Sequence, residues 1–130
     1  MTDTSMNAAV TYASYLKVDE LLALQQPRSE GPEHDELLFI VIHQVYELWF
    51  KELLHELDHV TRLLEADETH RAQHTLKRIL TILKVLVAQL DILETMTPRE
   101  FLTFRARLEA AGNTCVRPFK QWELSVRFRT

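Results

Sequence analysis

The sequence is poor in the residues that break helices and form tight turns. Its 130 residues include only 2 Gly and 4 Pro, where average usage would place roughly 15 of the two together. A sandwich or barrel of short strands needs a turn after each strand, so the shortage disfavours all-β folds and favours long helices. The length suits a single domain.

Cysteine is nearly absent as well, and no apolar run is long. The one cysteine, Cys115, excludes a disulfide within the chain, and no Cys-x-x-Cys pair suggests a zinc site. The longest unbroken apolar run, Leu37–Ile42, is far shorter than the ~20 residues that cross a membrane. No N-terminal apolar run follows a basic stretch, so we expect no signal peptide. We therefore expect a reduced, cytoplasmic protein without membrane contact.

Negative charge prevails over most of the chain. The formal net charge is -4 at pH 7, but residues 1–111 carry a net of -7 and residues 112–130 a net of +3. An acidic body offers no electrostatic footprint for nucleic acid. Residues 112–130 form a basic tail whose residue pattern predicts no particular structure.

Apolar residues three and four apart predict two long helices. The first runs from about His34 to Glu65, a stretch without Gly or Pro. Its early segment, Leu37–Ile42, is apolar all round, so we expect it to be buried on every side. The second runs from about Glu68 to Glu94, after a short connection in which Asp67 is the expected N-cap.

The second long helix carries a heptad seam, a stripe of apolar residues alternately three and four apart. The seam consists of Leu76, Ile79, Leu83, Leu86, Leu90 and Leu93. Because a short connection joins the two long helices, we expect an antiparallel hairpin. The predicted fold class is all-α, a long antiparallel helical hairpin with shorter helices.

Two shorter helices are expected beside the hairpin. One begins near Ser14 and ends before Pro27. The other begins at Thr97, where Pro98 suits the first helical position and Glu100 completes a capping box. The hairpin is therefore expected to lie between two shorter helical segments.

Paired Glu and His residues suggest a metal site, but only weakly. Glu52-x-x-His55 and Glu56-x-x-His59 match the spacing found in di-iron helical bundles. Such a site needs the same motif on a second, facing helix, and no other expected helix supplies it. We place these residues on the polar side of the long helix, as a solvated face rich in His and Glu.

His43 follows the most apolar turn of the chain and shares a helix face with Phe39, Tyr46 and Phe50. A histidine in such surroundings is desolvated and needs a hydrogen-bond partner. One interpretation is a core histidine bonded to a backbone carbonyl. The other is a histidine that lines an apolar pocket for a flat aromatic ligand with one N–H group.

Arg105 has apolar neighbours at helical spacing, namely Phe101, Phe104 and Leu108. Its stem could cover apolar surface or its head could form an ion pair. Alternatively, its guanidinium binds a ligand carboxylate through two parallel hydrogen bonds. A pocket with an aromatic wall, a polar histidine and a fixed arginine would recognise an aromatic amino acid.

Several blocks occur in order over about residues 11–108. They are Thr11-Tyr12-Ala13-Ser14-Tyr15-Leu16, Leu21-Leu22, Gln25-Gln26-Pro27, His34-Asp35-Glu36-Leu37-Leu38-Phe39-Ile40, His43-Gln44, Glu47-Leu48-Trp49, Leu93-Glu94-Thr95-Met96-Thr97-Pro98 and Phe101-Leu102-Thr103-Phe104-Arg105. This set resembles the N-terminal part of the tryptophan 2,3-dioxygenase family. The resemblance implies a helical-bundle haem dioxygenase that assembles as a homotetramer. Its members cleave the indole ring of L-tryptophan with O2 to N-formylkynurenine in the kynurenine pathway.

The resemblance also implies roles for individual residues. Phe39 would pack on the indole, His43 would hydrogen-bond the indole N–H in the distal haem pocket, and Arg105 would bind the substrate carboxylate. Phe101 takes a position where the family has Tyr or Phe lining the same pocket. A segment that reaches into a neighbouring subunit's site would contain Tyr12, Tyr15 and Leu16.

The family's proximal haem histidine has no counterpart among the six histidines, so no metal ligand is assigned to this chain. We expect residues 1–111 to be the N-terminal helical part of such a domain, followed by the unassigned tail over residues 112–130. The alternative is a truncated, non-enzymatic helical fragment that oligomerises without haem.

Overall fold

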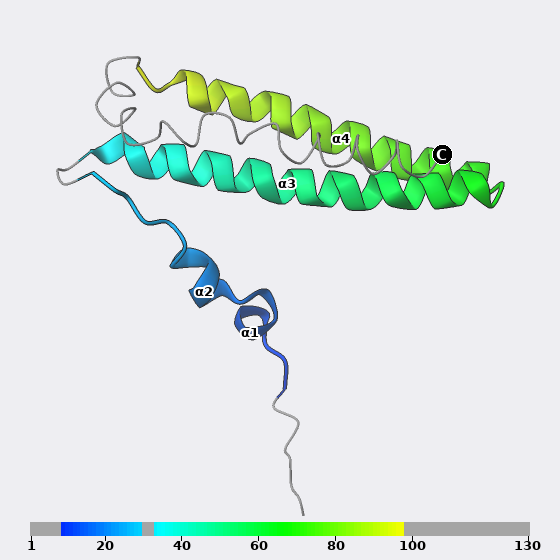
Figure 1. The fold of residues 1–130 in the computed structure, drawn as a ribbon, viewed down its shortest axis with the longest axis horizontal. Helices are drawn as coiled ribbons and strands as arrows, with labels where there is room; N and C mark the ends of the chain where they lie inside the picture. Colours follow the sequence, from blue (N-terminus) through cyan, green and yellow to red (C-terminus); the bar gives the residue numbers. More distant parts are fainter. Residues whose placement is uncertain (1–8, 30–32, 98–130) are drawn as a thin grey trace, which may run out of the picture.

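The computed structural model describes residues 9–29 and 33–97, which contain helices and no strand. In chain order the helices are α1 (Tyr12–Leu16), α2 (Val18–Leu22), α3 (His34–Glu65) and α4 (Thr69–Glu94). Figure 1 shows α3 and α4 side by side as a hairpin, with α1 and α2 on a segment that projects away from it. The all-α fold and the antiparallel hairpin are thus confirmed.

The turn between α3 and α4 is a left-handed cap of α3. Asp67 has φ 62°. Its N–H donates to the carbonyl of Leu64 at 3.1 Å, and the N–H of Glu68 donates to that of Leu63 at 2.8 Å. These bonds satisfy carbonyls at the end of α3, and aspartate tolerates a left-handed backbone better than most residues. The expectation that Asp67 caps α4 was therefore wrong: the N-cap is Glu68, whose side chain makes no capping bond.

The two long helices pack along one heptad seam from each. The buried residues of α3 include Ile42, Leu53, Glu56, Val60 and Leu63. Those of α4 are Ala72, Thr75, Ile79, Ile82 and Leu86. Leu53 is 2% exposed and is the largest fully buried side chain of the described residues. Burying a side chain of this kind contributes about 1.5–3 kcal/mol.

Part of the predicted seam of α4 does not face α3. Ile79 and Leu86 are buried as expected, whereas three leucines are 42%, 38% and 46% exposed, namely Leu76, Leu83 and Leu90. α4 is apolar on more than one side, so its periodicity alone does not decide which stripe faces α3. The observed stripe begins at Ala72 and Thr75, whose small side chains let the helices approach closely near the turn.

The apolar run at the start of α3 is covered on one side only. Ile42 is 6% exposed, whereas Leu37 and Val41 are 49% and 39% exposed. The expectation of burial on every side was therefore wrong for the described residues. The reason is that α4 covers a single face of α3.

α1 and α2 form where one short helix was expected. Thr11 and Ser14 make a reciprocal capping box, in which the Ser14 N–H donates to Thr11 Oγ1 at 3.2 Å and the Thr11 N–H donates to Ser14 Oγ at 3.0 Å. Lys17 then adopts a left-handed backbone, with φ 51° and ψ 49°, which ends α1 before α2 begins. Neither helix contains a buried residue.

Two expectations concern parts of the chain outside the described residues. They are the helix expected after Thr97 and the basic tail over residues 112–130. Thr97 itself is exposed and follows the end of α4. None of the helices that the structure describes is long and apolar enough to cross a membrane.

Candidate functional site

The ring of His43 is anchored to the backbone of its own helix. Its Nδ1 lies 2.7 Å from the carbonyl oxygen of Phe39, one turn earlier in α3. A carbonyl oxygen only accepts hydrogen bonds, so Nδ1 carries the proton and donates. In the neutral form of the ring, Nε2 is then an acceptor. The carbonyl-bonded interpretation of His43 is therefore confirmed. Its role in lining a pocket for an aromatic ligand stays a prediction.

Phe39 and His43 form an aromatic pair. Their ring centroids are 4.1 Å apart and their planes are inclined by 32°. Both residues are half-buried. The Phe39–His43 pair thus presents an aromatic wall and one nitrogen acceptor on a partly open face of α3. Such an arrangement can bind a flat aromatic ring that carries an N–H donor.

Tyr46 and Phe50, expected on the same face as His43, pack against the core of the hairpin. The Tyr46 hydroxyl donates to the carbonyl oxygen of Leu86 on α4 at 2.7 Å. The Phe50 ring lies 5.9 Å from the Tyr46 ring, centroid to centroid. Burial raises the pKa of the Tyr46 phenol. Tyr46 therefore joins α3 to α4 one turn after His43, which fixes how α3 is rotated there.

Gln44 fastens the N-terminal segment beside His43. Its Oε1 accepts a hydrogen bond from Gln25 Nε2 at 2.8 Å, and its own Nε2 donates to the Leu24 carbonyl at 3.1 Å. Helical periodicity could not reveal this role, because the partners lie 19 and 20 residues earlier in the chain. The one available signal was a glutamine directly after His43, which is too general to predict a contact.

Glu36 holds the loop that leads into α3. Glu36 lies in the first turn of α3, where its negative charge suits the helix N-terminus. In the structure Glu36 is 3% exposed and accepts from the backbone N–H groups of Arg28 at 2.6 Å and Ser29 at 3.1 Å, and from the Ser29 hydroxyl. A carboxylate this buried is stable because hydrogen bonds replace its lost water.

The described residues place no other predicted site residue beside the Phe39–His43 pair. Three of them lie on α1 and are 79%, 76% and 44% exposed, namely Tyr12, Tyr15 and Leu16. Figure 1 shows α1 pointing away from the hairpin, and α1 contacts neither α3 nor α4. Phe101 and Arg105 lie outside the described residues.

A hollow of about 660 Å³ opens beside the hairpin seam. It is lined by Val45, Leu48, Trp49, Glu52, Arg78 and Ile82. Neither Phe39 nor His43 lines it. This hollow is therefore separate from the Phe39–His43 pair.

The Glu-x-x-His residues of α3 do not all lie on a solvated face as expected. Glu56 is 5% exposed, and its Oε1 accepts from Arg78 Nη1 at 2.9 Å. Burial acts to raise the pKa of Glu56, but Arg78, with smaller contributions from Glu52 and His55, outweighs it and lowers the pKa. In the part of the chain that the structure describes, no group of three or more His, Cys, Asp or Glu side chains could hold a metal ion.

Comparison with known proteins gives one consistent match. The family model for tryptophan 2,3-dioxygenase matches residues 1–125. The tryptophan 2,3-dioxygenase of Herpetosiphon aurantiacus is 60% identical over 124 residues, which cover 95% of this chain and 48% of that protein. Those of Anaeromyxobacter dehalogenans and Nocardioides sp. are 64% and 50% identical over 113 and 120 residues, which cover 86% and 89% of this chain but 42% and 45% of their own lengths. The chain thus spans about half the length of the curated relatives it matches.

Proposed function

The chain belongs to the tryptophan 2,3-dioxygenase family, and we propose that it acts in a cytoplasmic, haem-dependent enzyme. This enzyme cleaves the indole ring of L-tryptophan with O2 to N-formylkynurenine, a step of tryptophan catabolism in the kynurenine pathway. Identities of 60% and 50% to proteins of that name, over nearly the whole chain, support the enzyme. They disfavour the alternative of a non-enzymatic helical fragment.

The Phe39–His43 pair is the observation that carries the proposal. Indole is a flat apolar ring with a single N–H, and the pair offers an aromatic wall beside a single acceptor. The bond from His43 Nδ1 to the Phe39 carbonyl fixes the direction of Nε2 before a substrate arrives. An acceptor oriented in advance loses less entropy on binding than a freely rotating one. Phe39 therefore packs on the indole, and His43 accepts its N–H.

Arg105 is the proposed partner of the substrate carboxylate, with Phe101 as a further wall. A guanidinium matches a carboxylate through two parallel hydrogen bonds. The antiparallel hairpin supports this assignment, because α4 ends at the same end of the hairpin where α3 begins (Figure 1). Thr97, which follows α4, thus lies toward the end of the hairpin where α3 begins.

Haem is the proposed cofactor, and Phe39 and His43 are proposed to lie beside it in the distal pocket. His43 is half-buried and uses Nδ1 for the Phe39 carbonyl, so its Nε2 faces the site as an acceptor flanked by an apolar ring. When bound, haem supplies the dioxygen chemistry. Phe39 and His43 orient the indole and exclude water from one side. Indole is electron-rich and reacts without prior loss of its N–H proton, so an oriented acceptor is sufficient.

The N-terminal segment is proposed to complete the pocket of a neighbouring subunit in a homo-oligomer, a tetramer by family resemblance. α1 buries none of its residues in its own chain. Tyr12 and Tyr15 are 79% and 76% exposed. Large exposed aromatic side chains at such density mark an interaction surface. Contact of α1 with the pocket of a neighbouring subunit would cover these side chains.

Replacing His43 tests the proposal directly. We expect His43→Ala to lower kcat for N-formylkynurenine formation by the haem-loaded enzyme about 3- to 10-fold, the effect of losing one hydrogen bond worth ~1 kcal/mol. His55→Ala, which removes an exposed histidine from the same helix, should leave kcat unchanged. A fall of ~10²–10⁴ would instead make His43 a general base. Full activity of His43→Ala would refute the role of the pair, and a haem-loaded wild type without turnover would refute the proposed function.

A further inference from the structure

A pocket at the closed end of the hairpin is lined by hydrogen-bond donors and by no carboxylate. Its volume is about 340 Å³. Its lining residues are His59 from α3 and His70, Arg71, His74, Thr75 and Arg78 from α4. We refer to it as the His/Arg pocket. It lies about sixteen residues along α3 from His43, roughly 24 Å at 1.5 Å per residue.

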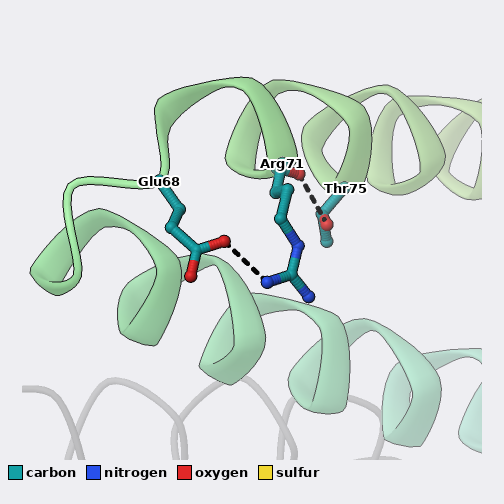
Figure 2. A network of polar contacts seen from close by, with 3 residues as sticks. All are labelled: Glu68, Arg71 and Thr75. Atoms are coloured by element: carbon teal, nitrogen blue, oxygen red, sulfur yellow. Dashed lines mark hydrogen bonds and ion pairs between the residues drawn. The ribbon is translucent and has the colours of Figure 1, made fainter.

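Both arginines of the His/Arg pocket are held in place by carboxylates that do not line it. Arg71 Nη1 lies 2.6 Å from Glu68 Oε2, and Arg78 Nη1 lies 2.9 Å from Glu56 Oε1. Figure 2 shows the Arg71 guanidinium beside Glu68 at the start of α4. A guanidinium has five N–H donors, so one such bond leaves most of them for a ligand. The ion pairs therefore orient the two forks without saturating them.

Three imidazoles complete the rim. His70 and His74 are one turn apart and so lie on the same side of α4, while His59 reaches the pocket from α3. Among the described residues, none of the three side chains has a hydrogen-bond partner. Each imidazole offers one N–H donor when neutral and two when protonated.

Thr75 is the buried residue among those that line the pocket. It is 4% exposed, and its hydroxyl donates to the Arg71 carbonyl at 3.1 Å, as Figure 2 shows. The N-terminus of α4 lies beside the pocket and has no side-chain cap. The positive end of the helix dipole therefore adds to the positive potential in the pocket. The volume far exceeds the ~30 Å³ share of a liquid water, so a tetrahedral anion fits with space for a small substituent.

We propose that the His/Arg pocket binds a phosphate group, either free phosphate or a small phosphomonoester. Phosphate oxygens only accept hydrogen bonds, and guanidinium forks pair with them through two parallel bonds. A cation would find no carboxylate in the lining, and an apolar ligand would leave the donors unmatched. This binding site is additional to the proposed oxygenase function and does not depend on it.

An NMR titration of the 130-residue protein with inorganic phosphate at constant ionic strength tests the site. We expect the imidazole signals of His59, His70 and His74 to shift with one saturating curve, while those of His34 and His55 stay in place. Chloride at the same ionic strength should shift none of them. A second titration with glycerol phosphate distinguishes the two ligands. Binding at least about threefold tighter than that of phosphate indicates a phosphomonoester. Equal or weaker binding indicates free phosphate.

Charge-matched variants separate a built site from a general charge effect. Arg71 is 64% exposed, so Arg71→Gln should fold normally, and we expect it to weaken phosphate binding about tenfold. Arg62→Gln removes the same charge from an exposed position outside the pocket and should change the affinity less than about twofold. Equal losses in the two variants, or phosphate shifts shared by all histidines, would overturn the proposal.

Discussion

The two ring nitrogens of His43 have different tasks. Nδ1 donates to the Phe39 carbonyl at 2.7 Å, which sets the tautomer of the neutral ring and its orientation about the helix. In the proposed site, Nε2 is then the acceptor for the indole N–H. A histidine without the carbonyl bond could present either nitrogen, and its orientation would be lost each time the side chain rotated. The proposed specificity of the Phe39–His43 pair for an N–H donor would therefore start from a local backbone contact.

Arg105 is expected to act in binding rather than in the chemical step. Removing a charge-assisted contact worth ~1.5–3 kcal/mol should raise KM for tryptophan about 10- to 100-fold in Arg105→Ala, with kcat nearly unchanged. Steady-state kinetics of the haem-loaded enzyme measure both constants. Arg107→Ala, two residues along the chain, is the matched control. A fall in kcat at constant KM would contradict the assignment.

Glu56 should make the hairpin sensitive to acid. Its folded pKa lies below the ordinary 4.5 because Arg78 outweighs the effect of burial. A carboxylate whose pKa is lowered on folding adds stability above the unfolded pKa and loses it as the pH falls through the folded value. The wild-type protein should therefore lose stability as the pH falls below about 4.5, and Glu56→Gln should lose less over the same range.

Urea unfolding at pH 7 and at pH 3, followed by circular dichroism, measures this difference. At pH 7 we expect Glu56→Gln to cost about 1–2 kcal/mol, below the value for a fully buried pair, because the Arg78 side chain is 54% exposed. Glu65→Gln, at the exposed end of α3, is the control. Identical pH profiles for Glu56→Gln and wild type would show that the Arg78 contact does not form.

At the scale of elements, α3 and α4 stabilise each other along a mixed seam. Most of the seam is aliphatic, but the buried Glu56 and Thr75 interrupt it. Glu56 Oε2 is buried without a hydrogen-bond partner among the described residues, which offsets part of the gain from its bond to Arg78. Apolar packing around Leu53 therefore has to provide most of the hairpin's stability.

Shortening Leu53 should destabilise the hairpin far more than shortening an exposed leucine of the same helix. Leu53 is 2% exposed, so Leu53→Ala removes buried surface and leaves a cavity, at a cost of about 2–5 kcal/mol. Leu64→Ala, at a position 55% exposed, should cost less than about 0.5 kcal/mol. The free energy of unfolding in urea compares the two variants, and similar losses would mean that the seam is not where the structure places it.

α4 also carries a second apolar stripe, which α3 leaves uncovered. Its members recur at heptad spacing and are 38–66% exposed: Leu76, Leu80, Leu83, Val87 and Leu90. The presence of two heptad stripes on one helix explains why three leucines of the predicted seam proved exposed. Both stripes satisfy the same spacing rule, and only the packing against α3 distinguishes them.

At the scale of the whole molecule, the N-terminal segment and the hairpin are joined by few but specific contacts. Glu36 and Gln44 hold the segment at the start of α3, while α1 and α2 contact neither long helix. The segment thus leaves the hairpin beside His43 and carries exposed aromatic residues outward. This geometry supports an action of α1 on another subunit.

Replacing the exposed tyrosines of α1 tests that action. We expect the double variant Tyr12→Ala/Tyr15→Ala to raise KM for tryptophan about 3- to 10-fold, the effect of losing ~1 kcal/mol of aromatic contact. The unfolding midpoint should not change, because neither side chain is buried in its own chain. Glu20→Ala, an exposed polar change on α2, should alter neither quantity.

Mixed oligomers show whether the tyrosines act in their own subunit or in a neighbour. When the double variant is mixed with His43→Ala chains and the subunits exchange, some sites combine an intact α1 with an intact His43 only if α1 acts between subunits. Activity above the sum of the separate variants is the expected result. Strictly additive activity would place α1 in its own subunit's site.

The sequence by itself determined the features that depend on neighbours within a turn or two. The apolar spacing predicted a helix over 34–65 and another over about 68–94, and the observed helices are His34–Glu65 and Thr69–Glu94. The pairing of Phe39 with His43 is also local, since residues four apart meet on one face of a helix. Family membership likewise follows from the order of the sequence blocks alone. Phe101, Arg105 and a boundary at residue 112 stay predictions.

Only the tertiary structure decided which surfaces meet. It selected one of two apolar stripes on α4, buried Glu56 beside Arg78, and turned Asp67 into a cap of the preceding helix. It also placed Gln44 against a segment 19 and 20 residues earlier. The spacing of apolar residues along a helix is the same on each of its apolar faces. The choice between such faces depends on contacts between residues distant in the chain, which no local pattern records.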